Sequence, residues 1–230
     1  MAYDLLLLDA DMTLLDFDRA EHESLRRALA NQGLPADKSI TEAYSRINWA
    51  LWSSYNRGEI TQSDILERRF VQLFDQMGLS GDPVRCGADY FLALRDCGHT
   101  LPGALDFCRK LYAAGKTLLI ATNGVAVTQW GRLRRSGLAT FITRMFISGE
   151  LGVQKPRREF FDQIFSALGE PDRSRCVIMG DSLNSDIQGG LNAGIDTIWF
   201  NPNRWPGSPD ICPKYEVHSY AEALEYLLED

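Results

Sequence analysis

Short apolar runs recur along the chain, and each gives way at its end to Asp, Thr, Asn or Gly. Four runs are clear, and a fifth at residues 145–148 is weaker. The clear runs are Leu5–Leu8 and residues 117–121, 176–179 and 197–200. Apolar runs of this length, bounded by turn residues and separated by helical patterns, indicate buried strands of a parallel sheet. We therefore predict an α/β fold with a three-layer parallel sheet, whose active site lies at the carboxyl ends of the strands.

Between residues 16 and 99 the pattern changes, because apolar residues recur at helical spacing and no strand-like run appears. This spacing predicts helices over about residues 18–33, 41–57 and 61–78, and a glycine marks the end of each. The sequence Leu101-Pro102-Gly103 marks the return to the sheet. We predict two domains: a core of residues 1–15 and 100–230, and an all-helical cap of residues 16–99 inserted after the first strand.

The formal net charge of −7 and the cysteine pattern argue against several classes of function. An acidic chain is not expected to bind a nucleic acid polymer or an anionic membrane surface, although one small anion can enter a locally positive pocket. The five cysteines are odd in number and widely spaced, so neither a disulfide framework nor a zinc site is expected. No apolar run approaches the roughly 18 residues of a membrane span, and the first residues do not resemble a signal peptide. We expect a cytoplasmic protein that acts on a small molecule, with its oligomeric state left open.

Two carboxylates follow the first apolar run directly, in the sequence Asp9-Ala10-Asp11-Met12-Thr13. Bending of the backbone at the end of a strand can aim both of them into one pocket. One carboxylate can then attack phosphorus while the other moves a proton, and both can help to hold a cation. The alternative is a pair of solvated aspartates in a turn, where Asp is common.

Groups suited to phosphate binding follow later in the chain. Thr122 and Asn123 come directly after the second core run and offer a hydroxyl and backbone N–H groups just before a helix. Lys155, in the pair Lys155-Pro156, can project into the same pocket and neutralise a phosphate. The alternatives are an ordinary helix N-cap at Thr122 and a solvated charge at Lys155.

A second pair of carboxylates follows the run at residues 176–179. Asp181 and Asp186 flank a turn that opens a helix, directly after Gly180. Oxygen ligands from two separate strand ends suit Mg²⁺, which keeps several waters and bridges to a substrate phosphate. Taken alone, Asp181 is equally explained as a turn residue and Asp186 as a helix cap. The order of all these groups along the chain favours phosphoryl transfer.

This set of motifs resembles the haloacid dehalogenase (HAD) superfamily, and the resemblance covers the whole chain. It implies a Rossmann-like, HAD-like core with the helical insert at the position of the family's cap. Position 12 is often Gly in the family and is Met12 here, which implies no loss of activity because that position varies. Asp11 matters more, because the family's dehalogenases lack this second Asp while its phosphatases and mutases have it.

The resemblance also implies a role for each residue of the core motifs. Asp9 would form an aspartyl-phosphate, and Asp11 would protonate the leaving alkoxide and then deprotonate the attacking water. The cofactor would be Mg²⁺, and the phosphoryl oxygens would be held by the Thr122 hydroxyl, the Asn123 N–H group and Lys155. The metal ligands would be the Asp9 carboxylate, the Asp11 backbone carbonyl and Asp181, with Asp186 acting through water or from a second layer.

Within this superfamily the chain more closely resembles one subgroup, the bacterial pyrimidine 5'-nucleotidases of the YjjG type. It rests on the first motif through Phe17-Asp18, on residues 51–61 and on the stretch from Ile178 to Ile187. It implies a Mg²⁺-dependent phosphomonoesterase that acts on a nucleoside 5'-monophosphate. The alternatives are a phosphatase of phosphoglycolate or a sugar phosphate, or a sugar-phosphate mutase.

The cap would close over the site and so select the substrate. Trp49, Trp52 and Tyr55 are spaced three apart on one predicted helix, and Trp52 and Tyr55 are candidates to stack on a base. The favoured alternative is that this stripe is the core of the cap itself. Arg57 and Arg69 are candidates to contact a sugar or a base, and the favoured alternative is that both lie on a solvated face.

Two other classes of protein share some of these features but fit the sequence less well. A non-catalytic phospho-acceptor domain also combines an Asp, a Thr and a Lys, but such domains are about half this length and lack an Asp at the +2 position and a helical insert. A dinucleotide-binding enzyme would need a G-x-G-x-x-G sequence after the first strand, and the chain has none there.

Overall fold

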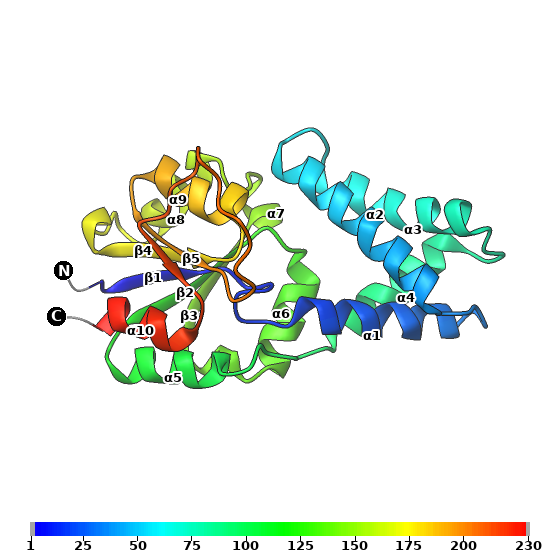
Figure 1. The fold of residues 1–230 in the computed structure, drawn as a ribbon, viewed down its shortest axis with the longest axis horizontal. Helices are drawn as coiled ribbons and strands as arrows, with labels where there is room; N and C mark the ends of the chain where they lie inside the picture. The colour runs from blue at the N-terminus through cyan, green and yellow to red at the C-terminus, as the bar shows by residue number, and fades with distance from the viewer. Residues whose placement is uncertain (1–2, 229–230) are drawn as a thin grey trace. The chain divides into compact units, whose positions relative to one another are not determined.

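The computed structural model describes residues 3–228 and shows a sheet of six parallel strands in the order β3-β2-β1-β4-β5-β6 (Figure 1). All neighbouring strands pair in parallel. The strands are β1 (Leu5–Leu8), β2 (Thr117–Thr122), β3 (Ile142–Ile147), β4 (Cys176–Gly180), β5 (Asp196–Phe200) and β6 (Tyr215–Val217). The predicted parallel α/β sheet is therefore confirmed, including the weak fifth run, while the short strand β6 was not predicted.

Two helical layers cover the sheet, because alternate side chains of each strand point to opposite faces. On one face, strand residues such as Leu6 and Leu8 pack with helices α5 (Ala104–Ala113), α6 (Ala126–Arg135) and α10 (Tyr220–Leu228). On the other face, Leu5 and Leu7 pack with α8 (Arg158–Ala167) and α9 (Gln188–Ala193). The shorter elements of this part are α7 (Ser148–Leu151), η1 (Leu138–Thr140), η2 (Arg173–Arg175) and η3 (Leu183–Ile187).

The register of the central strands brings their carboxyl ends to one level. Leu8 of β1 pairs with Ile120 of β2 on one side and with Met179 of β4 on the other. The residues that follow each of these three positions therefore meet at the same edge of the sheet. This edge is where the sequence places its polar motifs.

The chain divides into two compact units, one comprising the described residues of 1–16 and 98–230 and the other Phe17–Cys97. The second unit is helical throughout and contains α1 (Phe17–Ala30), α2 (Lys38–Asn56), α3 (Gln62–Met77) and α4 (Pro83–Arg95). Thr61 and Asp64 form a capping box at the start of α3, and Gly78 ends that helix with a positive φ of 61°. The helix α4 was not predicted from the sequence.

The core of the helical unit contains a buried polar cluster beside its aromatic residues. Arg69 is only 2% exposed, so the expectation of a solvated face was wrong for this residue. Its guanidinium lies 4.7 Å from the ring centre of Tyr90 and 4.6 Å from that of Phe91, and it donates to Asn48 at 3.4 Å. Asn48 in turn donates to the buried carboxylate of Glu21 at 2.7 Å. The faces of the aromatic rings and the amide of Asn48 thus replace water around the buried guanidinium.

Glu21 gives the helical unit a pH-dependent contribution to stability. Burial raises the pKa of Glu21, and the hydrogen bonds from Ser45 and Asn48 offset that effect only in part. The folded state therefore holds this proton more tightly than the unfolded state. The stability contributed by Glu21 is greatest in acid and declines as pH rises from the ordinary carboxyl range through the raised pKa.

The substitution Glu21→Gln should flatten this decline, because an amide keeps the hydrogen-bonding shape without a charge. We expect the free energy of unfolding at pH 8 to rise by on the order of 1 kcal/mol, with little change at pH 5. Urea unfolding at both pH values measures it. Glu23→Gln, on the same helix but exposed, is the matched control. Identical pH dependence in Glu21→Gln and the wild type would contradict the assignment.

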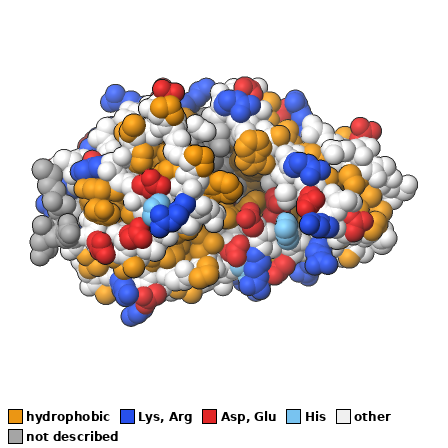
Figure 2. Space-filling model, viewed as in Figure 1, with side chains coloured by type: hydrophobic (Ala, Val, Ile, Leu, Met, Phe, Trp, Pro, Cys, Tyr) orange, Lys and Arg blue, Asp and Glu red, His pale blue; other side chains and the backbone are white. Residues whose placement is uncertain are grey.

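On the visible face of each unit, Figure 2 shows acidic and basic side chains side by side rather than a broad basic patch. Among residues 3–228, no helix combines the length and apolar character that a bilayer crossing requires.

Candidate active site

Asp9 lies at the carboxyl end of β1 and is 8% exposed. Its backbone N–H group donates to the carbonyl of Met179 at 2.9 Å, which extends the pairing of β1 with β4 by one residue. The chain then turns sharply, since the N–H groups of Leu14 and Leu15 both donate to the carbonyl of Ala10. Met12 takes a positive φ of 59° in this turn, a conformation that favours glycine. This geometry explains why a glycine would be suited to position 12.

Lys155 is the centre of the buried charges at this edge of the sheet. It is 1% exposed, and its Nζ donates to Asp9 Oδ1 at 2.6 Å, to Asp186 Oδ1 at 2.6 Å and to the Ala121 carbonyl at 2.5 Å. An ammonium group has three donors, so the three contacts satisfy it. The alternative of a solvated lysine is wrong.

The electrostatics of the site show an excess of negative charge. Burial raises the pKa of Asp9 to about 7, and Asp186 adds to that effect while Lys155 opposes it. Burial and the neighbouring Asp9 and Asp186 raise the pKa of Asp181 well above its ordinary value. Burial disfavours the charged form of Lys155, but attraction to Asp186 and Asp9 outweighs it and raises its pKa. A single lysine thus faces three carboxylates, and a further cation would relieve their repulsion.

The same three carboxylates have the arrangement of a metal site. Asp9, Asp181 and Asp186 each offer an oxygen within 4.8 Å of the oxygens of the other two. Carboxylate oxygens are the ligands that Mg²⁺ prefers. The donor set therefore fits a hard divalent cation. The side chain of Asp11 is not in this group, and its predicted part in metal binding was through the backbone carbonyl, which stays a prediction.

Asn123 fixes the loop that carries Lys155. The Asn123 side chain donates from Nδ2 to the Lys155 carbonyl at 3.0 Å and accepts from the Lys155 N–H group at 3.0 Å. This reciprocal pair joins the end of β2 to a residue 32 positions later. The side chain of Asn123 therefore has a structural function that its predicted backbone role did not include. Thr122, at the last position of β2, is 1% exposed, and its hydroxyl accepts from the Gly124 N–H group at 3.0 Å.

Asp181 is held through its backbone on both sides. Its N–H group donates to the hydroxyl of Thr13 at 3.1 Å, and its carbonyl accepts from the Trp199 indole at 2.8 Å. Thr13 is itself fully buried, and its carbonyl accepts from the Tyr220 hydroxyl at 2.7 Å. Thr13 thus ties the turn after β1 to the turn after β4, a function that the sequence analysis did not assign to it.

Asp186 is buried in a short π-helix, η3, directly after the turn at Ser182. Its Oδ2 accepts from the Ser182 N–H group at 3.0 Å, while Oδ1 accepts from Lys155. Gly180 leaves the space for this carboxylate, because a Cβ at position 180 would lie 2.2 Å from the carboxyl carbon of Asp186. The glycine before Asp181 is therefore required by packing and not by backbone conformation.

The substitution Gly180→Ala should displace the Asp186 carboxylate and weaken binding of Mg²⁺ by about 10- to 100-fold. Titration of Mg²⁺ followed by calorimetry measures this loss. Gly207→Ala is the matched control, because a Cβ there meets only an ordinary contact at 3.8 Å. Unchanged Mg²⁺ affinity in Gly180→Ala would contradict this role for Asp186.

Asp11 pairs with two side chains of α6 that the sequence analysis missed. Arg132 donates from Nη1 to Asp11 Oδ1, and Gln129 donates from Nε2 to Asp11 Oδ2 at 2.5 Å. Gln129 and Arg132 are three apart on the helix that follows Thr122, which places them on one helix face but does not by itself indicate a contact with Asp11.

The predicted substrate residues Trp52 and Tyr55 lie in the helical unit. Tyr55 is 6% exposed and belongs to the core of that unit, with its ring edge-on to Trp52 at 5.6 Å. Trp52 is partly buried against the same cluster, and Trp49 is 74% exposed. Arg57 is exposed and paired with Glu59 at 2.6 Å, as expected for a solvated face. Of the stripe, only Tyr55 is a fully packed core residue.

Comparison with known proteins agrees with the fold and the motifs. The family model of haloacid dehalogenase-like hydrolases matches residues 3–194, and the chain belongs to this family. The pyrimidine 5'-nucleotidase PynA of Streptococcus pneumoniae is 38% identical over 227 residues, covering 99% of this chain and 96% of PynA. The pyrimidine 5'-nucleotidase YjjG of Escherichia coli is 33% identical over 228 residues, covering 99% of each chain.

A solved structure shares the whole fold. The crystal structure of the HAD-hydrolase YfnB from Bacillus subtilis, bound to magnesium, has a TM-score of 0.92 and 36% sequence identity, and the match covers 99% of each chain. The predicted family and its HAD-like sheet with an insert after the first strand are thereby confirmed.

Proposed function

We propose that the protein is a Mg²⁺-dependent phosphomonoesterase that acts through an aspartyl-phosphate on Asp9. The observation that supports it most is the group formed by the buried Asp9, Lys155 and Asp186 and the half-buried Asp181, beside a second carboxylate, Asp11. A nucleophile, a phosphate-neutralising lysine, a cation site and a separate proton carrier are the parts that phosphoryl transfer needs.

The chemistry follows from the positions of these side chains. A carboxylate oxygen of Asp9 bonds to phosphorus while the bond from phosphorus to the ester oxygen breaks, and Asp11 gives a proton to that oxygen. Water then attacks the phosphorus, Asp11 takes up a proton from it, and the bond to Asp9 breaks to release orthophosphate. The Thr122 hydroxyl and the Asn123 N–H group hold the phosphoryl oxygens during both steps. Lys155 exchanges one of its three present contacts for a phosphoryl oxygen, so that its charge neutralises the phosphate.

The surroundings of Asp9 and Asp11 fit their different proposed roles, nucleophile for Asp9 and proton carrier for Asp11. Asp9 lies in the group of three carboxylates that fits a cation, whereas the side chain of Asp11 is turned to α6. Mg²⁺ would be held by the Asp9 carboxylate, the Asp11 backbone carbonyl and Asp181, with Asp186 acting through water. It would supply positive charge for the dianionic phosphate. Asp11 can then carry a proton without competing for the metal.

For the substrate we propose a nucleoside 5'-monophosphate, with pyrimidine bases preferred. Support comes from two relatives with this activity, PynA and YjjG, which match at 38% and 33% identity over nearly full length. A second candidate is another small phosphomonoester, such as phosphoglycolate or a sugar phosphate, because the core motifs serve any phosphomonoester alike.

A panel of phosphomonoesters with Mg²⁺, and with EDTA as control, tests both levels of the proposal. We expect kcat/KM to be highest for UMP, CMP or dTMP, lower for purine nucleotides and lower again for phosphoglycolate and sugar phosphates. A preference for phosphoglycolate or a sugar phosphate would overturn the nucleotide assignment only. An isomeric sugar phosphate without free orthophosphate would indicate a mutase, and turnover in EDTA would contradict the metal requirement.

A further inference from the structure

Both oxygens of the Asp11 carboxylate are held from one helix. Arg132 donates to Oδ1 and Gln129 donates to Oδ2, and these residues lie three apart on the inner face of α6. The two donor side chains are 1% and 2% exposed, whereas the Asp11 side chain keeps 27% of its surface exposed. The carboxylate is thus anchored from inside the protein and remains open to solvent.

The position of Gln129 is enforced by its neighbours. A Cβ at position 124 would lie 2.0 Å from Gln129 Nε2, so only Gly124 leaves room for this amide. The same Nε2 lies 3.4 Å from the Thr122 hydroxyl. The Gln129 amide therefore contacts both Asp11, the proposed proton carrier, and the hydroxyl of Thr122, a proposed phosphate-binding group.

The contact between the Gln129 amide and Asp11 leaves another atom of that amide without a hydrogen bond. Gln129 Oε1 is buried and has no hydrogen-bond partner among the described residues. A buried acceptor without a donor costs about 1–3 kcal/mol. Turning the amide would set Oε1 against the Asp11 carboxylate, so the contact with Asp11 determines the orientation of this side chain.

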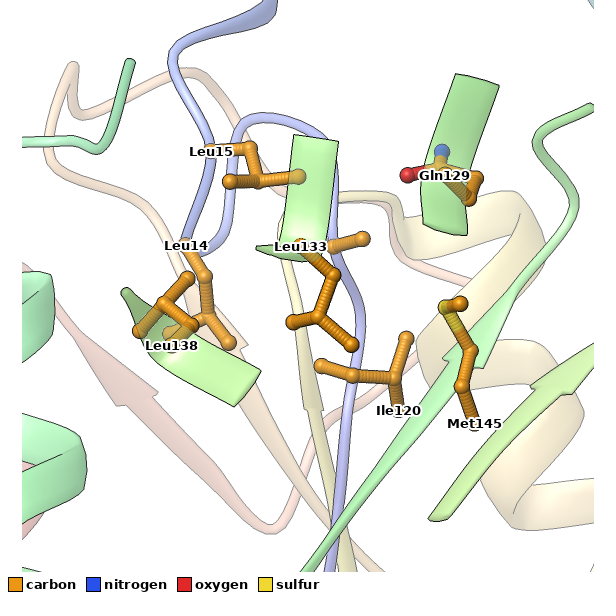
Figure 3. Close-up of a pocket in the computed structure, with 8 residues that line it drawn as sticks. Leu14, Leu15, Ile120, Gln129, Leu133, Leu138 and Met145 are labelled. Atoms are coloured by element: carbon orange, nitrogen blue, oxygen red, sulfur yellow. The ribbon is translucent and has the colours of Figure 1, made fainter. Parts of the chain in front are cut away.

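Helix α6 is itself fixed beside the turn that carries Asp11. Its residue Leu133 packs in one cluster with Leu14 and Leu15 of that turn and with Leu138 (Figure 3). This apolar contact fixes the position of α6 relative to residues 9–15. Arg132 and Gln129 are consequently presented to Asp11 by a packed element and not by a mobile loop.

We propose that Arg132 and Gln129 are positioning residues that fix the direction of the Asp11 carboxylate for proton transfer. This proposal rests on the proposed function, in which Asp11 protonates the leaving oxygen. Each carboxylate oxygen has two lone pairs, so each keeps one site for the substrate after accepting from α6. Loss of either donor lets the carboxylate rotate, and a displacement of about 1 Å can lower a rate by roughly 100-fold.

The test compares two substrates that differ in their need for a proton. The 5'-oxygen of UMP is a poor leaving group without protonation, whereas 4-nitrophenyl phosphate releases a stable phenolate. First-turnover rates isolate this step, as UMP cleavage in single turnover and as the burst of 4-nitrophenolate. In Arg132→Met we expect the UMP rate to fall about 10- to 100-fold and the burst rate to stay within about threefold of wild type. Gln129→Met should show the same selective loss, and Arg132→Lys should recover part of the UMP rate.

Matched controls separate positioning from stability. Arg134→Met removes an exposed arginine of the same helix, whose Nε donates to the backbone carbonyl of Trp130, and should leave both rates unchanged. Asp11→Asn should reproduce the selective loss more strongly. Thermal unfolding of each variant shows whether it is folded, and Gln129→Met carries the test if Arg132→Met does not fold.

The outcomes distinguish this inference from the proposed function. Equal losses on both substrates in Arg132→Met and Gln129→Met, with a selective loss in Asp11→Asn, would overturn the positioning role and leave the phosphatase chemistry intact. Equal losses in Asp11→Asn, or no cleavage of either substrate by the wild type, would overturn both.

Discussion

Replacement of Asp9 by asparagine should lower kcat for the best phosphomonoester by at least about 10³-fold. An amide oxygen is a poor nucleophile, so the aspartyl-phosphate cannot form. The shape of the site should survive, because Asn Oδ1 can still accept the hydrogen bond that Lys155 Nζ now donates to Asp9 at 2.6 Å. Steady-state release of orthophosphate with Mg²⁺ measures the loss.

The thermal stability of Asp9→Asn should not fall with its activity and is expected to stay equal or to rise. Burial raises the pKa of Asp9 to about 7, and its charge is opposed by Asp181 and Asp186, so removal of that charge relieves repulsion. We expect the melting temperature of Asp9→Asn in EDTA to equal or exceed that of the wild type. Asp4→Asn, just before the other end of β1 and exposed, is the matched control and should keep full activity. Near-wild-type turnover by Asp9→Asn would contradict the mechanism.

The second large effect is expected from Lys155→Met. This change leaves Asp9 and Asp186 buried and facing each other without the cation that now contacts both at 2.6 Å. Breaking a buried ion pair on one side costs about 3–5 kcal/mol. We therefore expect a loss of this size in the free energy of unfolding in EDTA, and a fall of about 10²-fold or more in kcat/KM.

Mg²⁺ distinguishes this electrostatic account from simple loss of packing. A bound cation would replace part of the missing positive charge, so Mg²⁺ should stabilise Lys155→Met more than it stabilises the wild type. Lys110→Met is the control, because Lys110 forms an exposed pair with Asp106 and should change stability by no more than about 0.5 kcal/mol. Equal stabilisation of Lys155→Met and wild type by Mg²⁺ would contradict the account.

The strand ends were predictable from the sequence because their signal is local. An apolar run followed by Asp9, or by Thr122 and Asn123, defines a buried strand and the polar group at its end. The parallel sheet then brings such ends together whatever the details of the helices. The pairing of Leu8 with Ile120 and Met179 shows this directly.

The side chains that orient these groups were not predictable in the same way. Arg132 and Gln129 reach Asp11 only because Leu133 packs α6 against the turn after β1. Thr13 reaches the N–H group of Asp181 across 168 residues of sequence. Such contacts depend on tertiary packing, and a residue type or a spacing in one segment does not reveal them.

The helical insert illustrates the same limit. Its α2 helix has the spacing that predicts a stripe of Trp49, Trp52 and Tyr55, yet burial decreases along that stripe from Tyr55 to Trp49. The packing of α3 and α4 against α2 determines which side chains are enclosed. Since α4 was not predicted, the inner face of the insert could not be assigned from the sequence.

A rapid-quench experiment tests the central claim, transfer of a phosphoryl group to Asp9, most directly. The enzyme reacts for a single turnover with UMP and Mg²⁺ in ¹⁸O-labelled water, is quenched in acid, and is digested for mass spectrometry. Asp11→Asn, which should slow the release of phosphate, serves as the variant that accumulates the intermediate, with 4-nitrophenyl phosphate in place of UMP because its leaving group needs no proton. We predict a phosphoryl group on the peptide that contains Asp9, and ¹⁸O in the orthophosphate but not in Asp9. Product formation without phosphorylated Asp9 in either protein, or ¹⁸O in the Asp9 side chain, would contradict the account.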